Sequence, residues 1–245
     1  MAEHKNKKFR VEVCFSPDEF DLYKQEYSVV VAIDVLRATT AICTAFEHGA
    51  EKVIPVSTVA EALVYKNKGY MAGAERNGQI VEGFEFGNSP YSYMGDAIKG
   101  KTLVLTTTNG TRAINIAAAT HKVIVGALVN LDAVIKYLID EPDDVLLLAS
   151  GWQGKFNLED SICAGAITEA LLESGKYMSD EDSTIASMFL FKEARVNYFG
   201  FLKASSHRRR LRNLNLNEDI KYCLTPNQTK VIPIYKDGAL VKMEI

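Results

Sequence analysis

Apolar runs and helical patterns alternate along the first 150 residues of the chain. Residues 28–33 predict a strand, and residues 39–48, followed by Gly49, predict a helix. Further strands are predicted at residues 52–56, 70–73, 101–105, 122–125 and 145–149, and further helices at 60–66, 111–119 and 131–139. Because repeated strand–helix pairs are typical of a largely parallel sheet, the sequence predicts an α/β fold.

The pattern changes after Gly151. Residues 158–172 and 183–198 predict two helices, and the tail predicts a hairpin of residues 230–235 and 239–244 around Asp237-Gly238. Residues 175–182 are the best candidate for an exposed connector. We treat residues 1–245 as a single α/β chain, with a possible subdivision near residues 175–182.

Composition supports a folded domain and limits its partners. The 245 residues are 47% hydrophobic, and 28 Lys and Arg residues against 31 Asp and Glu residues give a formal net charge of −3. Such a chain can bury a sizeable core, but it has no overall positive field to hold nucleic acid. Any anion site must therefore be local, and we expect no nucleic-acid partner.

The sequence also indicates where the protein works. Its apolar runs are far shorter than the roughly 20 residues that span a bilayer, and residues 1–8 lead into no apolar segment of a signal peptide. The four cysteines lie far apart, with no C-x-x-C pair. We expect a cytoplasmic protein without a membrane partner, whose thiols are reduced and mostly buried.

Polar residues follow four of the predicted strands. Ligands of open α/β sheets bind beyond the carboxyl ends of the strands, so we expect these residues to form one site. Carboxylates, guanidinium groups, hydroxyls and glycine turns together suit a divalent cation and a phosphate. The residues concerned are Asp34, Arg37, Thr39 and Thr40; Glu75 and Arg76; Thr106 to Arg112; and Ser150-Gly151 with Glu159 and Asp160.

Asp34 ends an apolar strand, where an unpaired carboxylate would be costly to bury. It is expected either to hold a metal or another cation, or to cap the following helix and form a salt bridge with Arg37. Arg37 could bind a phosphate or sulfonate through two hydrogen bonds, or only neutralise Asp34. Both alternatives stay open for each residue.

The turn of Thr107, Thr108, Asn109, Gly110 and Thr111 supplies hydroxyls and helix N-terminal amides that suit an oxyanion. It is not a Walker loop, and an ordinary helix cap is the alternative. Two other polar pairs could belong to the site or be simple surface features: Glu75 with Arg76, and Asn88 with Ser89.

Carboxylates for Mg²⁺ could come from four residues. Mg²⁺ prefers oxygen ligands and keeps several waters, so one or two carboxylates would suffice. The candidates are Asp34, Glu75, Glu159 and Asp160. Glu159 and Asp160 open a predicted helix, where acidic residues also favour the helix dipole without any function.

The run from His207 to Arg212 is rich in arginine but has no interleaved aromatic residues. A solvated helix face is the favoured interpretation. The alternatives are a segment that covers an anionic substrate and, least favoured, a nucleic-acid contact.

Several motifs in order resemble the 2-phosphosulfolactate phosphatase (ComB) family, over nearly the whole chain. They are residues 31–40 (Val-Ala-Ile-Asp-Val-Leu-Arg-Ala-Thr-Thr), 73–76 (Gly-Ala-Glu-Arg), 83–90 (Gly-Phe-Glu-Phe-Gly-Asn-Ser-Pro), 106–112 (Thr-Thr-Thr-Asn-Gly-Thr-Arg), Ser150-Gly151 with Glu159-Asp160 and Ala164-Gly165, and residues 219–223 with 231–233. The resemblance implies a three-layer α/β/α architecture with a largely parallel or mixed sheet.

The resemblance further implies a cytoplasmic, Mg²⁺-dependent phosphatase that converts 2-phospho-3-sulfolactate to 3-sulfolactate and phosphate, a step of the coenzyme M biosynthesis type. Its substrate carries phosphate, carboxylate and sulfonate groups, and a homodimer is plausible. The expected substrate-binding residues are Arg37, Thr39, Thr40, Arg76, Asn88, Ser89, Thr107, Thr108, Asn109, Gly110, Thr111 and Arg112. The alternatives are a phosphatase of another small phosphorylated acid and a noncatalytic anion-binding protein.

Two mechanisms fit the expected catalytic residues Asp34, Glu75 and Asp160. In the favoured one, Asp34 and a second carboxylate hold Mg²⁺ and a water attacks phosphorus, with Glu75 or Asp160 as base. In the other, Asp34 is the nucleophile and forms an aspartyl phosphate. Leu36 stands where related aspartyl-phosphate enzymes carry a second aspartate, which favours attack by water.

Overall fold

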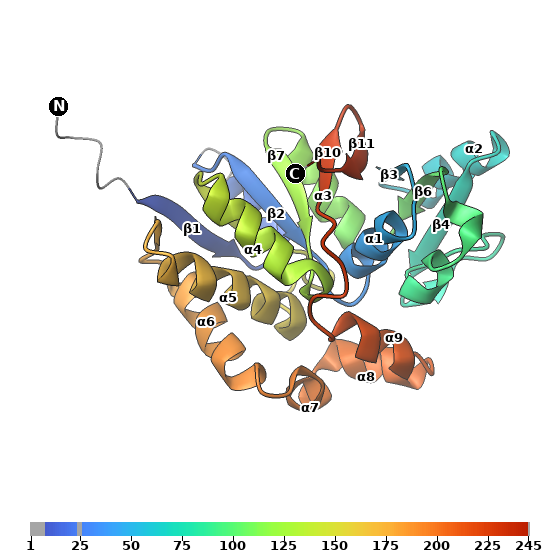
Figure 1. Ribbon diagram of the computed structural model, residues 1–245. Coiled ribbons are helices and arrows are strands. Elements are labelled where there is room, and N and C mark those ends of the chain that lie inside the picture. The colour runs from blue at the N-terminus through green and yellow to red at the C-terminus, as the bar shows by residue number, and fades with distance from the viewer. Residues whose placement is uncertain (1–7, 24–25, 245) are drawn as a thin grey trace.

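A computed structural model describes residues 8–23 and 26–244 of the chain (Figure 1). These residues form an 11-stranded sheet in the order β5-β4-β6-β3-β11-β10-β7-β2-β8-β1-β9. The strands are β1 (Phe9–Cys14), β2 (Val29–Ile33), β3 (Lys52–Pro55), β4 (Met71–Arg76), β5 (Gln79–Ile80), β6 (Thr102–Thr106), β7 (Lys122–Gly126), β8 (Val145–Ala149), β9 (Tyr177–Met178), β10 (Pro233–Lys236) and β11 (Ala239–Lys242).

The sheet is mixed because a hairpin joins two blocks of parallel pairs. In the first block β2 pairs in parallel with β7 and β8, and Val31 lies opposite Ile124 and Leu147. In the second block β6 pairs in parallel with β3 and β4. The β10–β11 hairpin lies between the blocks and pairs antiparallel with β7 and with β3. The predicted C-terminal hairpin is confirmed.

Helices cover both faces of the sheet, as the three-layer prediction requires. The α-helices are α1 (Ala38–Glu47), α2 (Val59–Asn67), α3 (Gly110–Ala118), α4 (Leu131–Asp140), α5 (Leu158–Glu173), α6 (Asp182–Ala194), α7 (Tyr198–Phe201), α8 (Ser206–Asn213) and α9 (Asn217–Cys223). Short 3₁₀ helices are η1 (Pro17–Leu22), η2 (Pro90–Tyr93), η3 (Asp96–Ile98), η4 (Leu128–Asn130) and η5 (Leu202–Ala204).

The central strand β2 shows why two helical layers form. All five of its residues are buried, so both of its faces need an apolar cover. Val29, Val31 and Ile33 belong to the core that includes α4 and α5. Val30 and Ala32 belong to the core that includes α1 and α3. The α/β class and the three-layer arrangement are therefore confirmed.

Three local predictions are corrected. The strand predicted at residues 28–33 is the second one, because the short alternating segment β1 precedes it and pairs with β8. The helix predicted at residues 183–198 ends at Ala194. Residues 175–182 are not only an exposed connector, because β9 pairs with β1 at the sheet edge and its Tyr177 is buried.

The basic run forms α8, and the expectation of a solvated face is wrong for half of it. His207, Arg208 and Leu211 are buried, whereas Arg209 and Arg212 are exposed. A helix with apolar or stacked partners on one side buries that side, even when its composition is strongly basic. The helix therefore turns a buried face toward the rest of the molecule.

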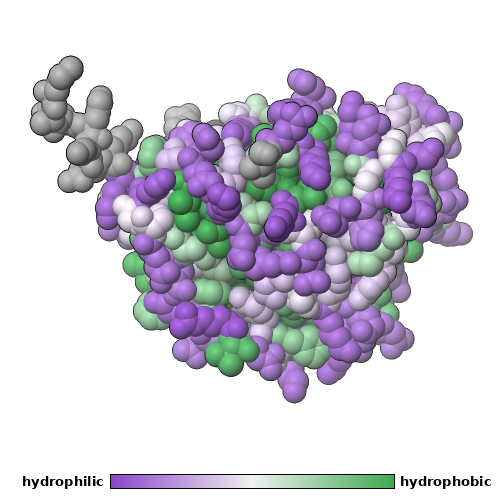
Figure 2. Space-filling view, in the orientation of Figure 1, coloured by the Kyte–Doolittle hydropathy of each residue, from purple (hydrophilic) through white to green (hydrophobic). Residues whose placement is uncertain are grey.

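The cysteines are buried and unbridged, as expected, and polar residues cover much of the surface seen in Figure 2. Hydrophilic residues dominate the face drawn in Figure 2, where apolar residues are divided among separate groups. All four cysteines are unbridged and buried, and burial raises the pKa of the Cys14 thiol to about 12. No helix within the described part of the chain is long and apolar enough to cross a membrane.

Candidate active site

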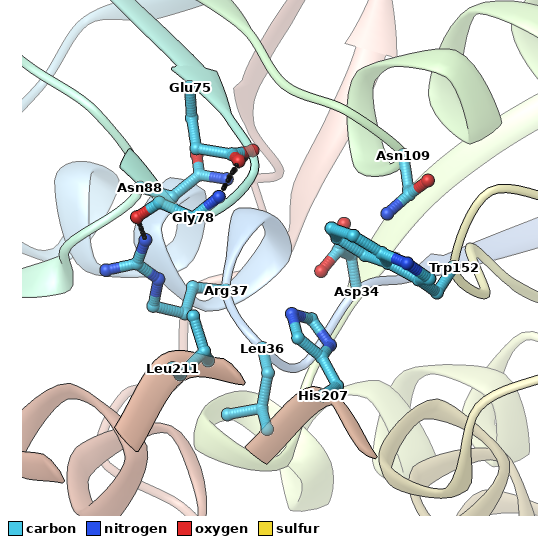
Figure 3. Close-up of a pocket in the computed structure, with 10 residues that line it drawn as sticks. All are labelled: Asp34, Leu36, Arg37, Glu75, Gly78, Asn88, Asn109, Trp152, His207 and Leu211. Atoms are coloured by element: carbon cyan, nitrogen blue, oxygen red, sulfur yellow. Dashed lines mark hydrogen bonds between the residues drawn. The ribbon is translucent and has the colours of Figure 1, made fainter. Parts of the chain in front are cut away.

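A narrow cavity lies where the residues after β2, β6 and β8 meet the buried face of α8 (Figure 3). Chain segments far apart in sequence supply its walls. The lining residues are Asp34, Leu36, Arg37, Glu75, Gly78, Asn88, Asn109, Trp152, His207 and Leu211. The cavity brings together predicted polar residues from three of the four strand ends, whereas the fourth contributes Trp152 in place of the predicted Ser150, Glu159 and Asp160.

Asp34 presents a poorly compensated carboxylate to this cavity. It is 7% exposed, and among the described residues its Oδ1 accepts only a long hydrogen bond of 3.4 Å, from the Ala38 amide. Burial raises the pKa of Asp34 to about 6; His207 opposes this shift and Glu75 adds to it. An ionised carboxylate in this environment is costly and would be stabilised by a cation or by hydrogen-bond donors of a ligand.

The N-terminus of α3 is packed directly against Asp34. A Cβ atom placed on Gly110 would lie 2.7 Å from Asp34 Oδ2 and 2.6 Å from the Ala38 Cβ. Only glycine allows this approach. The positive ends of α1 and α3 therefore both lie beside the carboxylate, which favours negative charge at this point.

Thr39 and Thr40 fix the β2–α1 turn from inside the protein. The Asp34 amide donates to Thr39 Oγ1 at 2.9 Å, and Thr40 Oγ1 donates to the Val35 carbonyl at 2.9 Å. Both threonines are fully buried. They shape the turn that holds Asp34, and they lie outside the cavity lining.

Arg37 lines the cavity but is already bound to protein groups. Its Nη1 donates to Asp219 Oδ2 at 2.5 Å, and its Nη2 donates to the Gly78 carbonyl at 2.8 Å. Asp219 also accepts a hydrogen bond of 3.1 Å from Ser89 Oγ. The peptide bond between Leu36 and Arg37 is cis. Arg37 and Ser89 therefore anchor α9 to the site through Asp219.

Glu75 is the second carboxylate of the cavity, and it organises the loops around it. Asn88 Nδ2 donates to its Oε2 at 3.2 Å, and the Thr108 amide donates to the same oxygen at 3.3 Å. The Gly78 amide donates to Oε1. These donors fix the orientation of the Glu75 carboxylate at the cavity.

His207 faces Asp34 from α8, and Glu159 holds its ring. The Nδ1 atom lies 2.7 Å from Glu159 Oε1, and Ser205 Oγ donates to Glu159 Oε2 at 3.2 Å. We assign the Nδ1 proton to this contact because a carboxylate oxygen is an acceptor. The Trp152 ring packs on the His207 ring, with centroids 5.1 Å apart. Nε2 is then the nitrogen available to a ligand, and Figure 3 shows the ring directed toward Asp34.

Asp160 is buried and fully engaged by donors of the protein. Its Oδ1 accepts from the Val35 amide at 2.8 Å. Its Oδ2 accepts from Asn157 Nδ2 at 2.8 Å and from the Gly151 amide at 3.3 Å. Burial raises its pKa, and the charges of Asp34 and Glu159 act in the same direction. Asp160 thus ties the β8–α5 turn to the residue after Asp34.

The threonine-rich turn is divided between two roles. Thr107 and Thr111 hold each other through reciprocal amide-to-hydroxyl hydrogen bonds of 3.1 Å. Asn109 accepts a hydrogen bond of 3.1 Å from the Gln153 amide on its Oδ1, and Figure 3 shows its nitrogen directed toward Asp34. This leaves the Asn109 amide nitrogen as a donor toward the cavity.

Arg76 and Arg112 line a second, more open cavity on the other side of this turn. Thr107, Thr108, Ser57, Asn115 and Ile116 complete its lining. Arg76 Nη2 donates to Thr106 Oγ1 at 3.1 Å, and Arg112 forms an exposed ion pair with Asp18. The structure therefore does not place these two predicted substrate-binding cations in the Asp34 cavity.

His207 and Trp152 are site residues that the sequence prediction missed. His207 and Leu211 are four residues apart on α8, and both line the cavity. That spacing in the basic run was a usable signal for one inward helix face. Trp152 directly follows the Ser150-Gly151 turn, where Gly151 has a φ of +61°.

The donor set of the cavity is compatible with Mg²⁺. Within residues 8–23 and 26–244, no group of three or more His, Cys, Asp or Glu side chains is arranged to hold a metal ion. Mg²⁺ needs fewer protein ligands than that, since one or two carboxylates and several waters suffice. Asp34 and Glu75 supply two carboxylates to one cavity, whereas Glu159 and Asp160 are occupied by other partners.

Comparisons with known proteins agree on one family. A family profile described as 2-phosphosulpholactate phosphatase matches residues 14–238. A protein of Caldanaerobacter subterraneus subsp. tengcongensis named "Probable 2-phosphosulfolactate phosphatase" is 42% identical over 213 residues, which cover 85% of this chain and 88% of that protein. Identically named proteins of Clostridium beijerinckii and Clostridium acetobutylicum are 34% and 35% identical, over 94% and 95% of this chain and 98% and 100% of theirs.

Proposed function

This chain belongs to the 2-phosphosulpholactate phosphatase family, and we propose that it hydrolyses 2-phospho-3-sulfolactate to 3-sulfolactate and phosphate. The proposal is supported mainly by the groups that line the Asp34 cavity. Two carboxylates, the N-terminus of α3 and a histidine held by a buried glutamate meet there. Phosphoryl transfer needs mainly positioning and charge neutralisation, and these groups can provide both.

We further propose that Asp34 and Glu75 hold Mg²⁺. The raised pKa of Asp34 and the neighbouring charge of Glu75 support this, because a cation between the two carboxylates would relieve their repulsion. When bound, Mg²⁺ would neutralise charge on the phosphoryl oxygens. Asn109 Nδ2 would donate to a remaining phosphate oxygen.

His207 is proposed to supply the proton for the leaving group. As a water oxygen forms its bond to phosphorus, the bond from phosphorus to the ester oxygen breaks. The proton on His207 Nε2 moves to that oxygen and gives the hydroxyl of 3-sulfolactate. A proton of the attacking water then passes from the new phosphate to His207 and restores it. Glu159 keeps the ring oriented through its contact with Nδ1.

Phosphate release from the purified chain tests the proposal. We expect 2-phospho-3-sulfolactate to be hydrolysed with Mg²⁺ and not with EDTA. Equal turnover of matched phosphates that lack the sulfonate would indicate a phosphatase of other small phosphorylated acids. The absence of turnover with every ester would contradict the proposal and favour a noncatalytic anion-binding protein.

Three further statements belong to this proposal. We propose a step of the coenzyme M biosynthesis type, which follows from the substrate alone. A cytoplasmic location is supported by the four buried, unbridged cysteines. The homodimer stays a prediction.

A further inference from the structure

Arg210 on α8 is a cation with two guanidinium nitrogens that no described residue uses as hydrogen-bond donors. Its Nε and Nη2 atoms are buried and have no hydrogen-bond partner among the described residues. Its neighbours differ in this respect, because Arg208 donates to the Phe199 carbonyl and Arg209 donates to the Ala204 carbonyl. Burying an arginine edge without an acceptor is costly, so this edge calls for a partner that the protein itself does not supply.

The two unused nitrogens form one recognition edge. Nε and Nη2 share one edge of the planar guanidinium group and donate in parallel within that plane, which matches two oxygens of a single oxyanion. The guanidinium carbon lies 4.1 Å from the centroid of the Trp152 ring. This stacking fixes the plane of the group and leaves its edge available.

Arg210 is connected to the active-site cavity through two neighbours. Trp152, on which it stacks, lines the cavity together with Asp34. His207, one turn earlier on the same helix, lines it as well. Burial lowers the pKa of Arg210 and the charge of Glu159 opposes this shift, but the two carboxylate oxygens of Glu159 are already bound to His207 and Ser205. Trp152 therefore links the guanidinium group of Arg210 to the lining of the cavity.

We propose that Arg210 is a specificity-determining residue that binds the sulfonate of the substrate, with Trp152 as its platform. The inference rests on the proposed function, in which the Asp34 cavity binds the phosphate and no residue has yet been assigned to the sulfonate. In 2-phospho-3-sulfolactate an oxygen and two carbon atoms separate phosphorus from sulfur, so the sulfonate lies beside the phosphate site. A sulfonate is weakly basic and stays ionised in a buried site, which suits a desolvated arginine next to an aromatic ring.

The first test compares three esters in four proteins. The esters are 2-phospho-3-sulfolactate, 2-phospholactate, which lacks the sulfonate, and the phosphate of 2-hydroxyethanesulfonate, which lacks the carboxylate. The proteins are wild type, Arg210→Lys, Arg210→Gln and the exposed control Arg212→Gln. We expect Arg210→Gln to raise KM for both sulfonates by about 10- to 10²-fold. Arg210→Lys should raise KM less, because lysine keeps the positive charge but lacks the two parallel donors of the guanidinium edge.

The same substitutions are expected to leave KM for 2-phospholactate within about threefold, and Arg212→Gln to change none of the three values. Equal losses on all three esters would overturn the proposal and make Arg210 a structural residue. A loss confined to the two esters with a carboxylate would overturn it as well, because Arg210 would then bind the carboxylate.

A second test does not depend on turnover. Trp152 is the single tryptophan of the chain, so its fluorescence reports on the Arg210 stack. We expect 3-sulfolactate to change the emission of wild type and of Arg212→Gln in a saturable way, lactate to leave it unchanged, and Arg210→Gln to lose the response. A protein that hydrolyses the ester but shows no such response would overturn the inference alone. A response without hydrolysis of any ester would support Arg210 and contradict the proposed function.

Discussion

The turns after β2 and β8 each place a buried aspartate at the active site, yet the two aspartates do opposite work. Asp34 accepts one long hydrogen bond and faces the cavity. Asp160 accepts three hydrogen bonds and lies outside the cavity lining. The two aspartates are similarly buried but have different roles. The Asp34 carboxylate is left for a ligand, whereas Asp160 holds the two turns together through the Val35 amide.

This difference shows how stability and function can be separated at one edge of a sheet. A carboxylate that the protein satisfies contributes to folding, whereas one that it leaves unsatisfied is a cost until a ligand binds. Four substitutions test the distinction, beginning with the largest expected effect.

Asp34→Asn removes the charge proposed to hold Mg²⁺ and keeps the shape of the side chain. We expect kcat/KM for 2-phospho-3-sulfolactate to fall by at least about 10³-fold. Phosphate release at saturating Mg²⁺ measures the loss, and circular dichroism checks that the fold is kept. Activity within about tenfold of wild type would remove Asp34 from the chemistry.

Arg37→Met tests whether the cation beside Asp34 serves the fold. It would leave Asp219 buried without its ion-pair partner, so we expect the free energy of unfolding to fall by about 3–5 kcal/mol. Urea unfolding measures this change. The double variant Arg37→Met/Asp219→Asn is the control, and it should recover part of the loss. An unchanged stability with a large rise in KM would instead make Arg37 a substrate-binding residue.

Asp160→Asn replaces one carboxylate oxygen by an NH2 group, which cannot accept a hydrogen bond. The side chain then cannot accept from Val35 on one atom and from Asn157 and Gly151 on the other. We expect the free energy of unfolding to fall by about 1–3 kcal/mol at pH 4, where the raised pKa of Asp160 favours its uncharged form and the lost acceptor decides the sign. Residual activity should follow the folded fraction of the variant. If Asp160 were the catalytic base, activity would instead disappear from a fully folded protein.

Arg112→Ala should have the smallest effect. Arg112 is exposed and paired with Asp18 on the far side of the threonine-rich turn, and exposed ion pairs contribute little. We expect kcat/KM and the melting temperature to stay close to those of wild type, with Asp18→Ala as the matched control. A tenfold or greater rise in KM for Arg112→Ala alone would bring the second cavity into the substrate site.

The sequence was informative where a local pattern decides the structure. The strand β2 with Asp34 directly after it, and the start of α3 at Gly110, follow from a continuous apolar run and from turn chemistry. Contacts between distant segments could not be predicted in this way. The pairs His207–Glu159 and Arg37–Asp219 join residues 48 and 182 positions apart, and no local pattern encodes which carboxylate such a cation will meet.

The basic run of residues 207–212 shows that composition alone could not predict which of its side chains are buried. Its arginines suggest a solvated surface, because each is charged and no aromatic residue stands between them. The partners that bury them, Phe199 and Trp152, come from other segments. Burial of an arginine thus depends on which rings the tertiary fold brings to it.

The pH dependence of stability tests the central claim most directly. The pKa of Asp34 is about 6 in the folded protein and has an ordinary value of 3.8, so its contribution to stability is present below about pH 4 and is lost as the pH rises through 6. In metal-free buffer at pH 8, Asp34→Asn should therefore be more stable than wild type by about 2–3 kcal/mol, and this gain should vanish near pH 4.

The decisive measurement is the free energy of unfolding of Asp34→Asn and Asp160→Asn beside wild type in EDTA at pH 4, where the raised pKa values favour the uncharged form of both carboxyl groups. We predict that Asp34→Asn matches wild type and that Asp160→Asn is less stable by about 1–3 kcal/mol, because Asp160 accepts three hydrogen bonds and Asp34 accepts one long one. An equal loss of stability in both variants would contradict the claim that Asp34 is held for a ligand while Asp160 is held for the fold.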